Sequence, residues 1–140
     1  MKWAVTTFCV IVLVFQLVYR TMGYFPAYQV GYGAITIMGC TISLTFLWLW
    51  WVRATPLALG MALSWAGAAC VMGWWWLYNV LGQPEPMQQN PQLFFFLSLY
   101  IVGAIMHFRV IEDALAWPRR FFWLPVIGAC CISLGIWSWG

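Results

Sequence analysis

The chain alternates between long apolar stretches and short polar connections that hold nearly all of its charges. Apolar residues dominate five stretches, which cover residues 3–19, 30–52, 57–81, 93–108 and 121–139. A bilayer core about 30 Å thick is crossed by an α-helix of roughly 20 apolar residues, so stretches of this length match it. The pattern predicts an all-α integral membrane protein, with residues 1–140 forming a single bundle of five transmembrane helices.

The connections between the stretches differ in length and content. Only residues 54–56 separate the second stretch from the third, and they end in proline, which fits the first turn of a helix. We therefore expect a tight helical hairpin there. Residues 23–29 are expected to be a loop whose tyrosines suit the headgroup region. Residues 82–92 are expected to be a loop without regular structure, because they contain three prolines and several amide side chains. The fourth helix is expected to continue past residue 108. For 121–139 a re-entrant hairpin is the alternative, which would leave four crossings.

Basic residues fall unevenly on the two sides of such a bundle. With five crossings one side receives only Arg20, and the other receives Lys2, Arg53, Arg109, Arg119 and Arg120. Short loops rich in Lys and Arg stay in the cytoplasm, so we expect the N-terminus inside and the C-terminus outside, in the inner membrane of a bacterium. The formal net charge of +3 is spread along the chain and forms no patch dense enough to predict a nucleic-acid partner.

Composition agrees with the membrane interpretation and offers little chemistry. The chain is 65% hydrophobic and 6% charged, whereas soluble domains are about 25% charged. Its five cysteines form no CxxC pair, so we expect apolar packing residues rather than a redox pair or metal ligands. No nucleophile triad, metal cluster or phosphate loop is present, and the sequence predicts a non-catalytic protein.

Small residues recur every four positions in the third stretch. The repeat consists of Ala58, Ala62, Ala66 and Cys70, and the second stretch offers a similar notch at Gly39 and Ser43. Small side chains let helix backbones approach closely in lipid. The third helix is therefore expected to be central, and these six residues are expected to pack against a partner's helix. Packing within this chain's own bundle is the alternative.

An aromatic cluster ends the third stretch, and it consists of Trp74, Trp75, Trp76, Tyr78 and Asn79. Consecutive indoles point around most of a helix, so at least one faces protein or a bound hydrophobic molecule. A flat lipophilic ligand such as a quinone, sterol or carotenoid is one hypothesis. Anchoring at the membrane interface, which Trp and Tyr favour, is the other.

His107 is the single histidine and stands at the end of the fourth stretch. A transmembrane b-type haem is usually held by two axial side chains, so such a haem is not expected. One axial ligand is enough for a chlorophyll-type pigment, which stays open as an alternative to hydrogen bonding at the interface.

Three charged residues follow His107. Arg109 precedes Glu112 and Asp113 by three and four residues, a helical spacing at which ion pairs form. We expect a water-exposed surface here, or a docking site for a cytoplasmic partner.

These patterns favour a small non-catalytic accessory or assembly subunit of a larger inner-membrane complex, such as a respiratory or photosynthetic one. It would pack against other integral membrane subunits and against lipid or pigment. The alternative is a free-standing binder or facilitator of a lipophilic small molecule, namely a quinone, sterol, carotenoid or lipid. An enzyme acting through His107, Glu112 and Asp113 is a third, weaker hypothesis.

Overall fold

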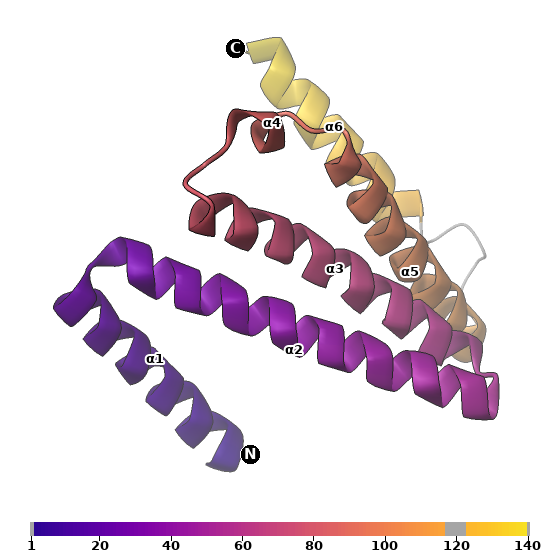
Figure 1. Ribbon diagram of the computed structural model, residues 1–140. Coiled ribbons are helices and arrows are strands. Elements are labelled where there is room, and N and C mark those ends of the chain that lie inside the picture. Colours follow the sequence, from indigo (N-terminus) through magenta and orange to yellow (C-terminus); the bar gives the residue numbers. More distant parts are fainter. Residues whose placement is uncertain (1, 117–122, 140) are drawn as a thin grey trace.

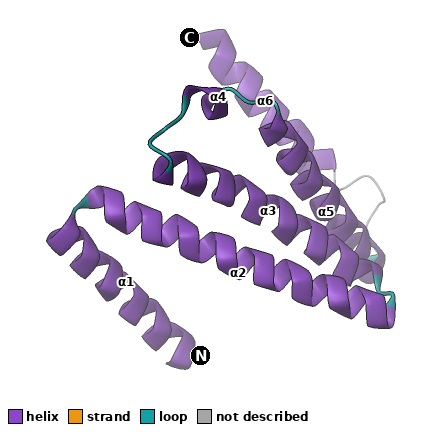
Figure 2. Ribbon diagram, in the orientation of Figure 1, coloured by secondary structure: helices purple, strands orange, loops and turns teal. Residues whose placement is uncertain are grey.

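The computed structural model describes every residue except 1, 117–122 and 140, and this part of the chain consists of helices joined by short loops (Figure 2). Its elements are α1 (Lys2–Met22), α2 (Tyr24–Arg53), α3 (Pro56–Val80), α4 (Glu85–Gln88), α5 (Gln92–Leu115) and α6 (Trp123–Trp139). No strand occurs among these residues. Four segments are long and apolar enough to cross a membrane, and they are α1, α2, α3 and Glu85–Leu115, which contains α5. The all-α prediction is confirmed.

Three helices form the packed centre of the molecule. Helix α3 lies between α2 and α5 and contacts both along much of its length (Figure 1). The third stretch is therefore the central helix, as predicted. Helix α1 leaves α2 at an angle from the connection at Gly23, so it touches α2 over a short distance only. Helix α6 lies beside α5 on the opposite flank.

Helix α2 begins earlier than the sequence predicted. The expected loop over 23–29 is wrong, because only Gly23 separates α1 from α2. Gly23 has a φ of 90°, a conformation that glycine adopts without steric strain. Pro26 is the third residue of α2, where the missing backbone N–H would have no partner within the helix anyway. At 1.5 Å per residue the 30 residues of α2 span about 45 Å, which exceeds a bilayer core of about 30 Å.

The tight hairpin between α2 and α3 is confirmed. Ala54 adopts a left-handed conformation with a φ of 50°, and its backbone N–H donates to the Trp50 carbonyl at 2.6 Å. Thr55 is extended, and Pro56 opens α3. These residues reverse the chain within two positions, so α2 and α3 run antiparallel from their shared end.

The remaining connections differ in part from expectation. Residues 82–92 include one helical turn, α4, so the absence of regular structure predicted there is wrong for Glu85–Gln88. Pro86 is tolerated as the second residue of that turn. Helix α5 continues to Leu115, which confirms its extension past 108. Helix α6 is uninterrupted, so a hairpin does not occur across Trp123–Trp139, while 121 and 122 lie outside the described residues.

Small side chains make up the buried core, and large ones lie outside. The buried apolar residues among those described are alanines, exemplified by Ala62 at 2% exposure, and no large side chain is fully buried. Bulky side chains such as Trp3 and Trp137, at 86% and 83% exposure, point outward. This distribution is the reverse of that in a soluble domain, where Leu, Ile, Val and Phe fill the core.

Glycines bring the backbones of α3 and α5 into contact. A Cβ atom on Gly103 would overlap the backbone nitrogen of Ser64 and lie 2.7 Å from the Gly60 carbonyl oxygen. A Cβ atom on Gly67 would lie 2.7 Å from the Cα atom of Tyr100. Because backbone atoms cannot move aside as the end of a side chain can, these two positions require glycine.

The variant Gly103→Ala tests this contact. Its methyl group should push α5 away from α3 and destabilise the fold by about 1–3 kcal/mol, which is the usual penalty for overpacking. The measurement is the temperature at which half of the purified protein loses its size-exclusion peak in mild detergent. Gly135→Ala is the control, because nothing lies within 4 Å of the Cβ position there. Equal midpoints for both variants would contradict the contact.

Candidate functional site

The residues predicted to pack against a partner lie largely inside the bundle. Ala58 and Ala62 are buried, and the Ser43 hydroxyl donates to the Ala62 carbonyl at 2.9 Å. A Cβ atom on Gly39 would lie 3.0 Å from the Cβ of Ala69. Packing within the chain, the alternative considered for this stripe, therefore accounts for these residues. Ala66 and Cys70 are half-buried, and docking of a partner on the stripe stays a prediction.

The three tryptophans of the aromatic cluster have different neighbours. The Trp74 indole N–H donates to the Met87 carbonyl at 3.1 Å, which ties α3 to the loop around α4. Trp76 lies against α2, since a Cβ atom on Gly33 would be 2.9 Å from its ring. Trp75 packs edge to face on Tyr78, with ring centroids 5.5 Å apart. Each indole thus has a protein neighbour, and a shared ligand site over Trp74–Asn79 stays a prediction.

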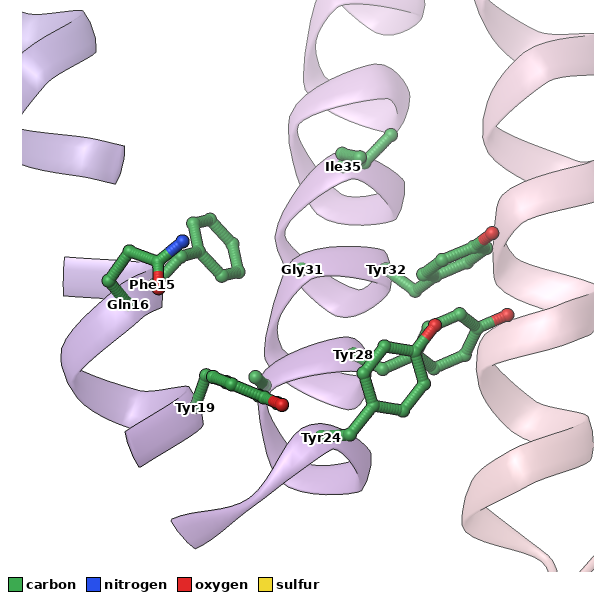
Figure 3. Close-up of a pocket in the computed structure, with 9 residues that line it drawn as sticks. Phe15, Gln16, Tyr19, Tyr24, Tyr28, Gly31, Tyr32 and Ile35 are labelled. Atoms are coloured by element: carbon green, nitrogen blue, oxygen red, sulfur yellow. The ribbon is translucent and has the colours of Figure 1, made fainter. Parts of the chain in front are cut away.

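A ladder of tyrosines lines the start of α2. Tyr24, Tyr28 and Tyr32 follow one another at four-residue spacing, with ring centroids 6.0 and 4.1 Å apart. Tyr28 and Tyr32 extend from α2 on the side away from α1 (Figure 3). The Asn79 side chain is an electrostatic neighbour of the Tyr28 hydroxyl, which brings the end of α3 to this ladder. Asn79 also donates to the Trp75 carbonyl at 2.7 Å.

A cleft of about 340 Å³ opens between α1 and α2 (Figure 3). Phe15 and Tyr19 reach into it from α1, and Gln16 lies beside Phe15. Ala27 and Gly31 hollow out the α2 side, and the Phe15 ring lies 3.2 Å from where a Cβ atom on Gly31 would be. Ile35 and the tyrosine ladder also contribute to the lining of α2, although the rings of Tyr28 and Tyr32 point away from α1.

Sequence reasoning missed this cleft because residues 23–29 were interpreted as a loop. Once α2 begins at Tyr24, Ala27 and Gly31 are one helical turn apart and face the end of α1. The small–xxx–small spacing of these two residues is the signal that could have revealed the notch in α2. Its position opposite Gln16 and Tyr19 follows only from the turn at Gly23.

A second cavity of about 420 Å³ lies between α5 and α6. Its walls contain no charged side chain and consist of Tyr100, Ile101, Ala104, Ile105, Phe108, Pro125, Val126, Ala129 and Cys130. The two flanking helices, α1 and α6, are therefore each separated from the core by an open apolar space.

His107 is partly buried near the start of α3. Its Nε2 atom is buried without a hydrogen-bond partner among the described residues, and a Cβ atom on Gly60 would lie 3.4 Å from its backbone nitrogen. Its role as a single pigment ligand stays a prediction. No group of three or more His, Cys, Asp or Glu side chains in the described parts of the chain is arranged to hold a metal ion.

The charged end of α5 is less exposed than predicted. Arg109 and Asp113 are exposed, but Glu112 is only 3% exposed. The expected water-exposed surface is thus wrong for Glu112, because helical spacing reveals neighbours on the same helix but not which flank tertiary packing covers. Docking of a cytoplasmic partner through these three residues stays a prediction.

The five cysteines differ in their exposure. All five are free thiols, and only Cys70 is half-buried, whereas Cys9, Cys40, Cys130 and Cys131 are exposed. These four thus do not pack within the chain, and their expected role as small apolar packing residues stays a prediction. Small size permits burial but does not require it.

Comparison with known proteins provides no relative of this chain. No protein-family model, curated protein or solved structure matches it. Inference about its function therefore rests on its own residues and cavities.

Trp74→Phe tests the tie between α3 and the loop around α4. The phenyl ring keeps the contact with Phe96 but loses the hydrogen bond to Met87, which contributes about 1 kcal/mol. Backbone amides of residues 81–91 should exchange with deuterium several-fold faster, as followed by mass spectrometry. Trp75→Phe is the control, because Trp75 contacts Tyr78 on its own helix. Unchanged exchange in Trp74→Phe would show that the bond does not hold the loop.

Proposed function

We propose that this protein is a small, non-catalytic subunit of a larger membrane assembly, and that it crosses the bilayer five times. The observation that carries the proposal is the poor packing of α1 on the rest of its own chain. Helix α1 has 21 residues, and none of them is buried. Its contacts are with α2 near the connecting turn, where Phe15 approaches Gly31.

The distribution of apolar side chains supports insertion into a bilayer. Large apolar side chains are exposed on every long helix, and four segments have the length and hydropathy of membrane spans. In water, exposed apolar surface on this scale would cause aggregation. Hydrocarbon solvates it instead, and small residues then hold the helices together by close van der Waals contact.

A helix packed as little as α1 needs another neighbour to hold its position. In lipid no hydrophobic effect drives helices together, so packing contacts have to do so. Trp3, Val10 and Leu17 recur every seven residues on α1 and lie on the face opposite Phe15, Gln16 and Tyr19. This seven-residue spacing is the repeat with which two helices pack along a seam. We expect a helix of another integral membrane subunit to lie on this face.

The positions of basic residues support one orientation. Arg53 is the last residue of α2 and lies beside the start of α3. The C-terminal half of α5 lies near the start of α3 as well, because a Cβ atom on Gly60 would lie 3.0 Å from the Cβ of Met106. Arg53 and Arg109 are thus toward one end of the bundle, whereas Arg20 is at the other. We propose that the end with Arg53 and Arg109 faces the cytoplasm of a bacterial cell and that the C-terminus lies outside.

Co-purification from native membranes tests the subunit proposal. Tagged protein extracted in mild detergent should carry at least one other integral membrane chain in stoichiometric amount. Val10→Trp should reduce that recovery about tenfold, because an indole cannot enter a seam shaped for valine. Leu44→Trp is the matched control on α2, where Leu44 is exposed away from α1. A particle containing copies of this chain alone would overturn the proposal.

Thiol labelling of intact cells tests the orientation. In a variant with the five native cysteines replaced by alanine, Gln88→Cys should react with a membrane-impermeant maleimide, and Thr55→Cys should react only after lysis. The reason is that the two connections lie at opposite ends of α3. Labelling of Thr55→Cys but not Gln88→Cys in intact cells would invert the topology.

A further inference from the structure

We infer that the cleft between α1 and α2 binds a neutral amphiphile that has a flat head with carbonyl oxygens and an apolar tail, the chemistry of a quinone. The cleft measures about 340 Å³ and belongs to this chain alone. The inference therefore does not depend on a partner subunit.

Two polar side chains of α1 line the cleft without a hydrogen-bond partner in the described part of the chain. Gln16 and Tyr19 are both exposed, lie one helical turn apart on α1 and line the cleft. Neither side chain forms a hydrogen bond with any residue that the structure describes. In a membrane-spanning helix an amide or phenol without a partner is unfavourable, and such residues mark functional positions.

Several hydroxyl groups in the long helices are satisfied within their own helix. Hydroxyl groups donate to the carbonyl one turn earlier, as in Thr36 to Tyr32 at 2.7 Å, Thr41 to Ile37 at 2.9 Å and Ser98 to Phe94 at 2.7 Å. The Tyr19 phenol and the Gln16 amide form no such bond among the described residues. Each carries a hydrogen-bond donor beside its acceptor oxygen, so a carbonyl oxygen in the cleft could accept from either.

The cleft favours a neutral head. No Lys, Arg, His, Asp or Glu lines it. Arg20 follows Tyr19 in the chain but is not part of the wall. Phosphate recognition normally uses Arg or Lys, so an anionic phospholipid is a poor complement.

The shape of the cleft favours one ring and the start of one chain. Its volume lies at the lower end of the range for small-molecule sites, which is roughly 300–1,000 Å³. Tyr19 and Tyr24 lie close to the turn at Gly23, whereas Ile35 is about 17 Å further along α2. Polar groups therefore gather toward the membrane surface and apolar ones toward its middle. The head would lie between Tyr19 and Gln16, and the tail would pass Gly31 and leave toward Ile35.

Binding of decyl-benzoquinone to the purified full chain in mild detergent tests the inference, with bound quinone measured by absorbance after size exclusion. Tyr19→Phe and Gln16→Leu should each weaken binding about three- to tenfold, because each removes one donor and leaves the shape nearly unchanged. Gly31→Leu should abolish binding by filling the cleft. Gly135→Leu is the matched control, because nothing lies within 4 Å of that Cβ position.

Two further probes separate the sources of affinity. Decylbenzene, which has the tail and ring without oxygens, should bind at least about tenfold more weakly, and phosphatidylglycerol should not displace the quinone. Equal affinity for decylbenzene would overturn recognition of the head, and displacement by phosphatidylglycerol would assign the cleft to anionic lipid. If Gly31→Leu does not fold, the test rests on the quinone affinities of Tyr19→Phe and Gln16→Leu. Wild-type affinity in both variants would reject the site. Quinone binding is measured on this chain alone and does not require partner subunits. A failure of the quinone inference can therefore be distinguished from a failure of the subunit proposal.

Discussion

Close contact between helix backbones is the interaction on which the rest of this structure depends. Gly67 and Gly103 allow α5 to touch α3, and Gly39 and Ser43 allow α2 to reach the other side of α3. No large side chain is fully buried among the described residues, so van der Waals contact between small residues replaces the apolar core of a soluble protein. Van der Waals attraction weakens when atoms separate by a fraction of an ångström. A methyl group added at these positions is therefore expected to reduce stability more than one added on the surface.

The same dependence explains why the flanking helices are loose. Helices α2, α3 and α5 have small residues on facing sides, whereas α1 presents Phe15, Gln16 and Tyr19 to α2. Bulky side chains hold α1 away from α2, and the cleft is the space that remains. The cavity between α5 and α6 has walls of similarly large residues, such as Phe108. The two open spaces beside the flanking helices therefore lie where large side chains keep the helix backbones apart.

The errors of sequence reasoning have specific physical causes. Residues 23–29 were expected to be a loop with tyrosines at headgroup depth, yet α2 already begins at Tyr24, and Pro26 is harmless in the first turn of a helix. Glu112 was expected in water, but the covering of one helix flank is a tertiary effect. In each case the local property of the residue was interpreted correctly, but its burial or conformation depends on contacts with other parts of the chain.

The sequence by itself determined the apolar central parts of the long helices, the tight turn before Pro56 and the central place of α3. These features follow from apolar length, proline chemistry and the spacing of small residues, which act over a few neighbouring positions. Only the tertiary structure decided which helix faces which. It placed Gln16 and Tyr19 opposite Gly31, and it buried Ala62 against α2 rather than leaving it for a partner. The physical reason is that each turn sets the angle between two successive helices, as Gly23 does for α1 and α2. This angle determines which residues of the two helices come into contact.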